Sequence, residues 1–385
     1  MPGTNTRTAV ESAVGETYSA AARAVVPELC CPIDYDPKYL RVIPAEVLER
    51  DYGCGDPSRH VRPGETVLDL GSGSGKIAFI ASQVVGAEGR VVGVDVNEEM
   101  LALARSAAPT VADAIGHDNV TFLRGRIQDL ALDLDAVARR LRDRPVSDVA
   151  ELAALEADLA ALRHDRPLIA DDSVDVVVSN CVLNLVAPED KRQLFAEIFR
   201  VLRRGGRAVV SDIVSSVEVP QALRDDPELW SGCVSGALQE EAFLAAFTDA
   251  GFHGVRLDTR AGEPWREVDG IEFRSVTVVA YKGKQGECRD HGQAVIYKGP
   301  WKAVLDDDEH VFERGVPTAV CAKSFELYGR DPYTGSFELL EPTEPVDPAS
   351  APLFACAPPA SLGAGGPVRR DVTGLRSDCD QPGCC

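Results

Sequence analysis

Long apolar runs are missing from this chain of 385 residues. No stretch of about eighteen uninterrupted apolar residues occurs, and residues 1–26 have no basic start followed by an apolar core. A membrane-spanning helix needs about 20 such residues, and a secretory signal needs a shorter apolar core behind basic residues. We therefore predict a soluble, cytoplasmic protein without a membrane partner.

Basic residues are also scarce relative to acidic ones. Lysine and arginine total 40 against 61 aspartate and glutamate residues, for a formal charge of -21. The summed field of such a protein repels polyanions, so nucleic acid is not expected as a partner. The six histidines are scattered along the chain, and we do not expect them to form a metal site.

Cysteine is present in quantity, but the tight double CxxC spacing of a structural zinc site is absent. Without an export signal, the eleven cysteines are better interpreted as thiols than as a disulfide framework. Those that bear on the argument are Cys30, Cys31, Cys54, Cys181, Cys233, Cys379, Cys384 and Cys385.

Short apolar runs alternate with amphipathic segments between residues 66 and 213. Thr66–Leu70, Arg90–Val94 and Val174–Ser179 are typical of buried strands, whereas Glu98–Ala107 has helical periodicity. This alternation predicts βαβ units and an α/β fold with a largely parallel, Rossmann-like sheet.

The remaining segments suggest additional parts around this sheet. We expect an N-terminal arm or lid, a Rossmann-like domain, a helical insertion within it, a smaller α+β domain, a C-terminal accessory domain and a flexible cysteine-containing tail. Their expected ranges are 1–60, 61–213, about 130–170, 214–284, 285–340 and 341–385, respectively.

The strongest local motif is a glycine-rich turn directly after an apolar strand. It contains Gly71, Ser72, Gly73 and Gly75, preceded by Asp69. Glycine allows positive φ and close approach of a ligand to the backbone.

The next strand ends in a second carboxylate, Asp95. An acid at this position can accept hydrogen bonds from both hydroxyls of a ribose. Asp69 suits the ammonium and sulfonium of S-adenosylmethionine better than a pyrophosphate. A nicotinamide or flavin dinucleotide and a turn without ligand remain the alternatives at this point.

Four motifs give the chain a more specific resemblance. They are Tyr52–Gly55, the glycine loop Leu68–Gly75, Val178–Val186 around Cys181, and Leu229–Ala237 around Cys233. The glycine loop is shared by many methyltransferases. Together, however, the motifs resemble those of the arsenite methyltransferase family, over roughly residues 31–328 and again at the C-terminus.

The resemblance implies a class I methyltransferase fold with S-adenosylmethionine as cofactor and trivalent arsenic as methyl acceptor. It implies that Cys54, Cys181 and Cys233 hold the arsenic. The implied cofactor-binding residues are Asp69, Gly71, Ser72, Gly73, Gly75, Asp95, Ile127 and Asn180. The chain departs from the family at Ile127-Gln128, where members commonly have Ile-Glu, and in its helical segment before Asp171.

The chemistry fits thiolates, because trivalent arsenic is soft and prefers sulfur to oxygen. The resemblance further implies a redox pair formed by Cys54 and an N-terminal cysteine, Cys31 or its neighbour Cys30. Glutathione or thioredoxin would reduce the resulting disulfide. A methyltransferase of another small molecule and a non-catalytic thiol protein that binds metalloids are the alternative functions.

Overall fold

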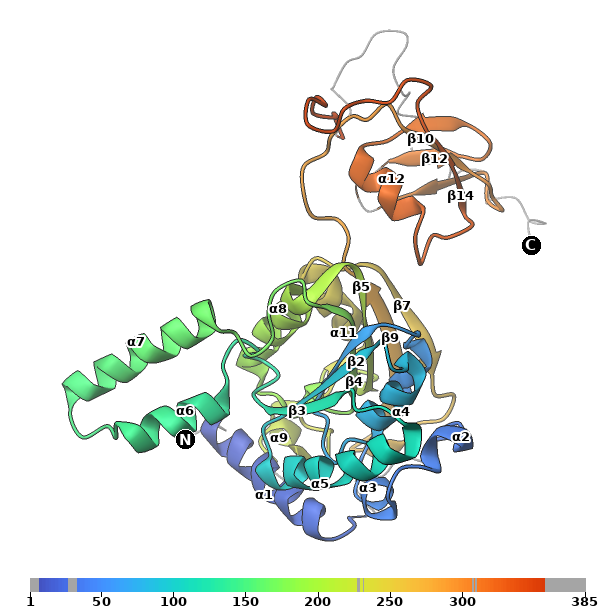
Figure 1. Ribbon diagram of the computed structural model, residues 1–385. Coiled ribbons are helices and arrows are strands. Elements are labelled where there is room, and N and C mark those ends of the chain that lie inside the picture. Colours follow the sequence, from blue (N-terminus) through green and yellow to red (C-terminus); the bar gives the residue numbers. More distant parts are fainter. Residues whose placement is uncertain are drawn as a thin grey trace. The chain divides into compact units, whose positions relative to one another are not determined.

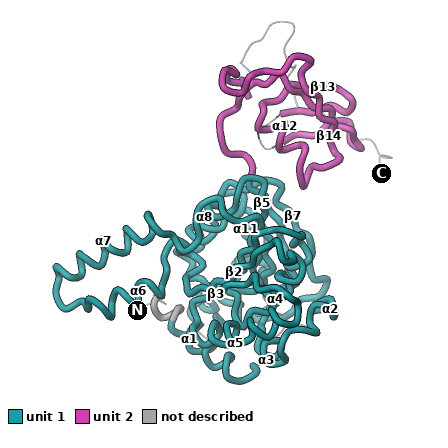
Figure 2. Tube along the Cα trace, viewed as in Figure 1, with its two compact units in different colours: residues 1–282 teal, residues 283–385 magenta. Residues whose placement is uncertain are grey.

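The computed structural model describes residues 7–26, 33–226, 229–230, 232–306, 308 and 310–356, with side chains from residue 12 onward. The chain divides into two compact units, residues 1–282 and residues 283–385 (Figure 2). Cys30, Cys31, Cys379, Cys384 and Cys385 lie outside the described residues.

Unit 1 is built on one mixed sheet (Figure 1). Its main strands follow the order β3-β2-β1-β4-β5-β9-β7, and the first five are parallel. Their bounds are β1 Thr66–Leu70, β2 Arg90–Asp95, β3 Val120–Arg124, β4 Val174–Asn180, β5 Leu202–Ser215, β7 His253–Arg260 and β9 Ile271–Tyr281, with the short strands β6 Leu238–Gln239 and β8 Arg266–Val268.

Helices cover both faces of this sheet because successive strand residues point to opposite sides. Val67 of β1 packs in one core cluster with α4 (Lys76–Val85) and α5 (Glu98–Ile115). Leu68 packs in the other, with α8 (Lys191–Val201) and α11 (Glu240–Asp249). This Rossmann-like layering confirms the predicted fold class.

The other described helices of unit 1 lie near the strand ends or outside the sheet. They are α1 Arg7–Arg23, α2 Pro37–Leu40, α3 Ala45–Glu49, η2 Pro57–His60, α6 Leu134–Asp143, α7 Val149–Asp165, η3 Leu183–Leu185, η4 Pro188–Asp190 and α9 Gln221–Arg224. Within the described part of the chain, no helix combines the length and apolar character needed to cross a membrane.

The segment from 214 to 284 differs from the separate α+β domain expected from its sequence. Its strand β9 pairs with β5 over nine residues, and β7 pairs with β9. Both therefore extend the central sheet. Pairing between strands so distant in sequence has no local signal, which is why the sequence suggested a domain boundary instead.

The helical insertion forms two helices, α6 and α7, that project from the sheet as a hairpin (Figure 1). Neither helix has a fully buried residue, and Val149 is 81% exposed. Arg163 of α7 pairs with Asp129 at 2.8 Å, which ties the hairpin to the loop after β3. The apolar residues of α7 remain largely outside the core.

Unit 2 has its own small core, formed by six buried residues: Val295, Tyr297, Phe312, Val320, Phe325 and Tyr328. Its elements are β10 Ala294–Tyr297, β11 Ala303–Leu305, β12 Val311–Glu313, β13 Pro317–Ala319, α12 Ala322–Tyr328 and β14 Phe337–Leu340. The order β13-β10-β14 forms an antiparallel sheet, and β11 pairs with β12.

The residues between β14 and residue 356 are packed onto unit 2, whereas their composition predicts a flexible tail. Leu353 bridges to Arg289, and Phe354 N donates to Cys288 O at 2.7 Å. Ala351 is 1% exposed. This final described segment therefore packs onto the start of unit 2.

Candidate active site

A cavity of about 470 Å³ opens at the carboxyl ends of the parallel strands. It lies where the strand order reverses, between β1 and β4. In open α/β sheets, this switch point is where ligands bind. The N-terminal helix α1 contributes Tyr18 and Gly15 to the lining.

Seven of the eight residues predicted to bind the cofactor line this cavity: Asp69, Gly71, Ser72, Gly73, Asp95, Ile127 and Asn180. Gly75 is absent from the lining among the described residues. It instead takes φ 95° at the N-cap of α4 and ends the glycine turn. Gln128, at the position where the family commonly has glutamate, also lines the cavity.

The glycine turn is tight because two loops meet there. Gly71 has φ 66°, and a Cβ on it would lie 2.3 Å from Cγ1 of Val182, which follows β4. Gly73 N donates to Asp95 Oδ2 at 2.9 Å, so the turn and the end of β2 are held together. A side chain at Gly71 would therefore separate the two loops that border the cavity.

Asp69 Oδ2 and Ser72 Oγ are among the polar atoms of the cavity wall that are buried without a hydrogen-bond partner within the described residues. Burial and the nearby charges of Asp51 and Asp95 raise the pKa of Asp69 well above its usual value. Buried polar atoms in native proteins almost always have partners. A ligand that presents an ammonium or hydroxyl groups, as S-adenosylmethionine does, fits these atoms.

Three cysteines from distant segments meet at one end of the cavity. Cys181 follows β4 and lines the cavity, Cys54 precedes η2, and Cys233 lies in the loop before β6. Cys54 Sγ and Cys181 Sγ lie within 4.8 Å of each other, and Cys233 Sγ donates a hydrogen bond to Cys181 O at 3.4 Å. All three side chains are buried and share one core cluster.

The surroundings favour the protonated form of the Cys181 and Cys233 thiols. The hydrogen bond with Cys233 lowers the pKa of Cys181, but the hydrogen bond with Cys54, burial and the charge of Asp212 raise it well above its usual value. The hydrogen bond with Cys181, followed by burial, raises the pKa of Cys233 in the same way.

Asp212 is a member of the site that sequence reasoning missed. It is fully buried in β5, and one carboxylate oxygen lies within 4.8 Å of the sulfur atoms of Cys54 and Cys181. Burial raises the pKa of Asp212 to about 6. Backbone hydrogen bonds from Ile213 and Leu183 and the charge of Lys191 act in the opposite direction and lower it. An acidic residue inside the apolar run 208–214 is the signal that could have found it.

Asn180 lines the cavity and also holds the loop that contains Cys54. Its Oδ1 accepts hydrogen bonds from the backbone of Cys54 at 2.9 Å and of Gly55 at 3.1 Å. Its Nδ2 donates to Gly55 O at 2.8 Å and to Tyr35 Oη at 3.1 Å. Asn180 thus fixes the Cys54 loop against the end of β4.

The predicted redox partner Cys31 lies outside the described residues, as does Cys30. Tyr18 of α1 was not singled out from the sequence, where nothing marks it. Burial raises the pKa of Tyr18 well above its usual value, and the charges of Cys233, Cys181, Asp212 and Asp95 act in the same direction. Tyr18 lines the same cavity as Cys181 and Asp95.

Comparison with known proteins identifies the family to which the chain belongs. The chain is 32% identical to the arsenite methyltransferase of Aquipseudomonas alcaligenes, over 81% of this chain and 84% of that protein. The human arsenite methyltransferase is 33% identical, over 72% of this chain and 69% of its own length. The chain belongs to the arsenite methyltransferase family.

A solved structure agrees with this assignment. The arsenic(III) S-adenosylmethionine methyltransferase of Chlamydomonas reinhardtii shares 29% sequence identity and matches with a TM-score of 0.56, covering 82% of this chain and 99% of that one. A methyltransferase domain profile matches residues 62–143 and 146–251, and a domain of unknown function matches residues 284–364. As a member of the arsenite methyltransferase family, the chain is an S-adenosylmethionine-dependent methyltransferase.

Proposed function

We propose that this enzyme methylates trivalent arsenic held by Cys54, Cys181 and Cys233. One observation carries the proposal: three thiols from segments far apart in sequence converge at the end of a cavity that Cys181 itself lines. A structural role would not require one of these thiols to line a ligand cavity.

Trivalent arsenic binds thiolates in preference to oxygen ligands because it is soft. Each As–S bond replaces an As–O bond, with the thiol proton leaving on the displaced hydroxide as water. Because their surroundings raise the pKa of the Cys181 and Cys233 thiols, a nearby proton acceptor aids this exchange. The Asp212 carboxylate, within 4.8 Å of two of the sulfur atoms, takes that role.

The cofactor pocket supplies the second reactant. Asp69 suits the ammonium of S-adenosylmethionine, Asp95 its ribose, and Ile127 contributes an apolar wall for the adenine. When bound, S-adenosylmethionine supplies a methyl group activated by a sulfonium. The chain's own residues have mainly to orient the two reactants, because the arsenic lone pair attacks without losing a proton.

Orienting the two reactants can supply a large part of the reduction in activation free energy. Holding two reactants in a near-attack geometry can contribute about 7–11 kcal/mol. The hydrogen bonds of Asn180 to the Cys54 loop, and of Cys233 Sγ to Cys181 O at 3.4 Å, restrict the positions of the sulfur atoms. Burial of all three side chains excludes water from the arsenic.

Methyl transfer leaves arsenic formally pentavalent, and two thiolates can return it to the trivalent state by giving up two electrons. A sulfur–sulfur bond forms in that step. We propose Cys54 and Cys31, or its neighbour Cys30, as this pair, with glutathione or thioredoxin as the reductant that restores the thiols.

The direct test is incubation of the enzyme with S-adenosylmethionine, arsenite and a thiol reductant, followed by speciation of the arsenic. We expect methylated arsenicals, and a loss of at least about 100-fold for Cys181→Ser, comparable to other losses of reactant alignment. Cys379→Ser, which changes a cysteine outside the proposed arsenic site, is the control and should retain methylation.

Two outcomes would remove the proposal. If several reductants yield inorganic arsenic alone while S-adenosylmethionine binds, the methyl acceptor is another molecule. If equilibrium dialysis shows arsenite binding without saturable affinity for S-adenosylmethionine, the protein sequesters arsenic and does not methylate it.

A further inference from the structure

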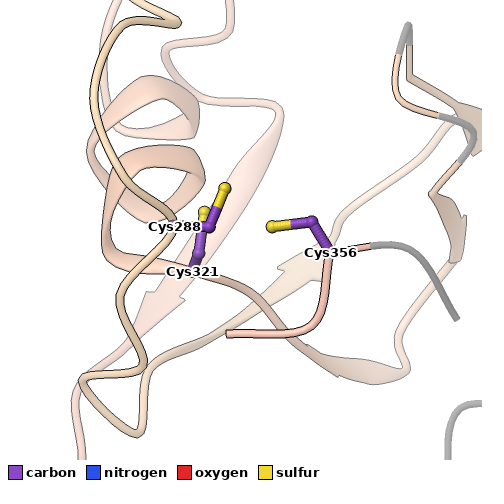
Figure 3. A group of neighbouring side chains, drawn as sticks. All are labelled: Cys288, Cys321 and Cys356. Carbon is purple, nitrogen blue, oxygen red and sulfur yellow. The ribbon is translucent and has the colours of Figure 1, made fainter. Parts of the chain in front are cut away.

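A second group of cysteines lies in unit 2, within the segment that matches a domain of unknown function. The sulfur atoms of Cys288, Cys321 and Cys356 all lie within 4.8 Å of one another. Figure 3 shows the thiol of Cys356 pointing toward those of Cys288 and Cys321. None of the three is in a disulfide, and the methyl-transfer mechanism uses none of them.

Backbone hydrogen bonds bring these three segments together. Phe354 N donates to Cys288 O at 2.7 Å, which aligns the final described segment with residues 288–290. Ala322 N donates to Arg289 O at 2.8 Å, which brings the start of α12 to the same segment. The grouping therefore results from the fold of unit 2 and not from chance rotamers.

The cluster is open to small solutes. Cys321 is 1% exposed, whereas Cys288 and Cys356 are partly exposed. Partial burial of Cys288 acts to raise the pKa of its thiol. Hydrogen bonds with Cys356, Lys323 and Cys321 outweigh this effect and lower the pKa below its usual value. A thiol with greater thiolate character beside two others is a reactive ligand set for a soft ion.

The number of ligands discriminates between ions. Structural zinc takes four ligands in a tetrahedron, with zinc–sulfur bonds of about 2.3 Å. Among the described residues, this group contains three donors and no fourth cysteine, histidine or carboxylate. The neighbouring His310 is already engaged through both ring nitrogens, with Asp306 at 2.9 Å and with Cys356 O at 2.7 Å.

Trivalent arsenic needs three sulfur ligands and keeps its lone pair on the fourth side. We propose that Cys288, Cys321 and Cys356 form a second binding site for trivalent arsenic, separate from the methyl-transfer centre. Three thiols and one arsenous acid give one tris-thiolate complex and three waters. No electron is transferred, so the step needs no oxidant or reductant.

The site is tested in the full chain from which the first site has been removed. In a Cys54→Ser, Cys181→Ser, Cys233→Ser background, we expect arsenite to bind at about one atom per chain, measured by equilibrium dialysis with arsenic analysis. X-ray absorption should show three sulfur neighbours. Because this background cannot methylate arsenic by the proposed route, the outcome is independent of the proposed function.

Adding Cys321→Ser to this background should raise the Kd for arsenite by more than about 10-fold, since even outer-shell changes weaken ion sites by that factor. Serine can still cap α12 in place of the Cys321 thiol, which accepts from Ser324 N at 3.4 Å, so the fold should survive. Unchanged thermal unfolding of the variant would verify this.

The matched control replaces the cysteines outside the described residues: Cys30, Cys31, Cys379, Cys384 and Cys385. In the same background, their change to serine should leave the Kd unchanged. Loss of binding in this control, or retention of binding in the Cys321→Ser variant, would overturn the proposal. Stoichiometric zinc that resists displacement by arsenite and disappears with Cys321→Ser would assign the site to zinc instead.

Discussion

Cys181 and Cys233 share a left-handed backbone conformation, with φ of 63° and 61°, and Cys233 Sγ donates a hydrogen bond to Cys181 O at 3.4 Å. A non-glycine residue in this region costs about 1–3 kcal/mol and persists where the surroundings enforce it, often at functional sites. Here both strained residues carry buried thiols of the same cluster. The strain therefore supports a functional origin for the cluster.

The role of Asn180 can be separated from cofactor binding by Asn180→Ala. Loss of its amide leaves the backbone N–H groups of Cys54 and Gly55 without their acceptor, which costs about 1–3 kcal/mol of stability. We expect arsenite affinity to fall while S-adenosylmethionine affinity stays close to that of the unmodified enzyme, both measured by calorimetry.

Asn119→Ala is the control for that experiment, because Asn119 makes hydrogen bonds to Ser82 and Gly86 at the C-terminal end of α4. It should lower stability without changing arsenite affinity. A large loss of S-adenosylmethionine affinity in Asn180→Ala, with arsenite binding intact, would return Asn180 to the cofactor-binding residues.

Arsenite binding should depend on pH through Asp212. Burial raises the pKa of Asp212 to about 6, so the carboxylate is protonated below that pH and ionised above it. The ionised form accepts the thiol proton. The rate of arsenite association, measured by stopped-flow binding, should therefore increase as pH rises from about 5 to about 7. The Asp212→Asn variant should not show this increase.

Asp175→Asn is a suitable comparison for Asp212→Asn, because Asp175 also accepts from a backbone group, Thr66 N at 2.7 Å, but lies at the start of β4. Its pH profile should match that of the unmodified enzyme. An identical pH step in Asp212→Asn would show that another group accepts the proton.

Gly53 should tolerate no side chain. A Cβ at this position would lie 2.2 Å from Asn180 Nδ2, and overpacking of this kind costs about 1–3 kcal/mol. We expect Gly53→Ala to displace the Cys54 loop and reduce both thermal stability and methylation. Gly262→Ala, where a Cβ meets nothing within 4 Å, should change neither.

Asp95 is expected to bind the cofactor ribose. Hydrogen bonds to charged groups are worth about 1.5–3 kcal/mol, so Asp95→Ala should raise the Kd for S-adenosylmethionine by about 10- to 100-fold. Asp113→Ala, which removes an exposed carboxylate of α5, provides the control. Equal Kd values for the two variants would exclude Asp95 from the ribose site.

Local patterns in the sequence were sufficient for the central fold and for part of the site. The apolar run Thr66–Leu70 is the observed strand β1, and the acidic end of the next run is Asp95 at the end of β2. Asp69, the glycine turn and Asp95 line one cavity because parallel strands present their carboxyl ends at the same edge.

Tertiary structure alone decided which groups surround the thiols. Asp212 reaches Cys181 through the register of β4 against β5, where Asn180 pairs with Ser211. The placement of β9 beside β5, and of Cys288 beside Cys321 and Cys356, likewise depends on pairing between distant segments. Periodicity and turn motifs reflect interactions between sequence neighbours, whereas these contacts are set by strand register and packing across the whole fold.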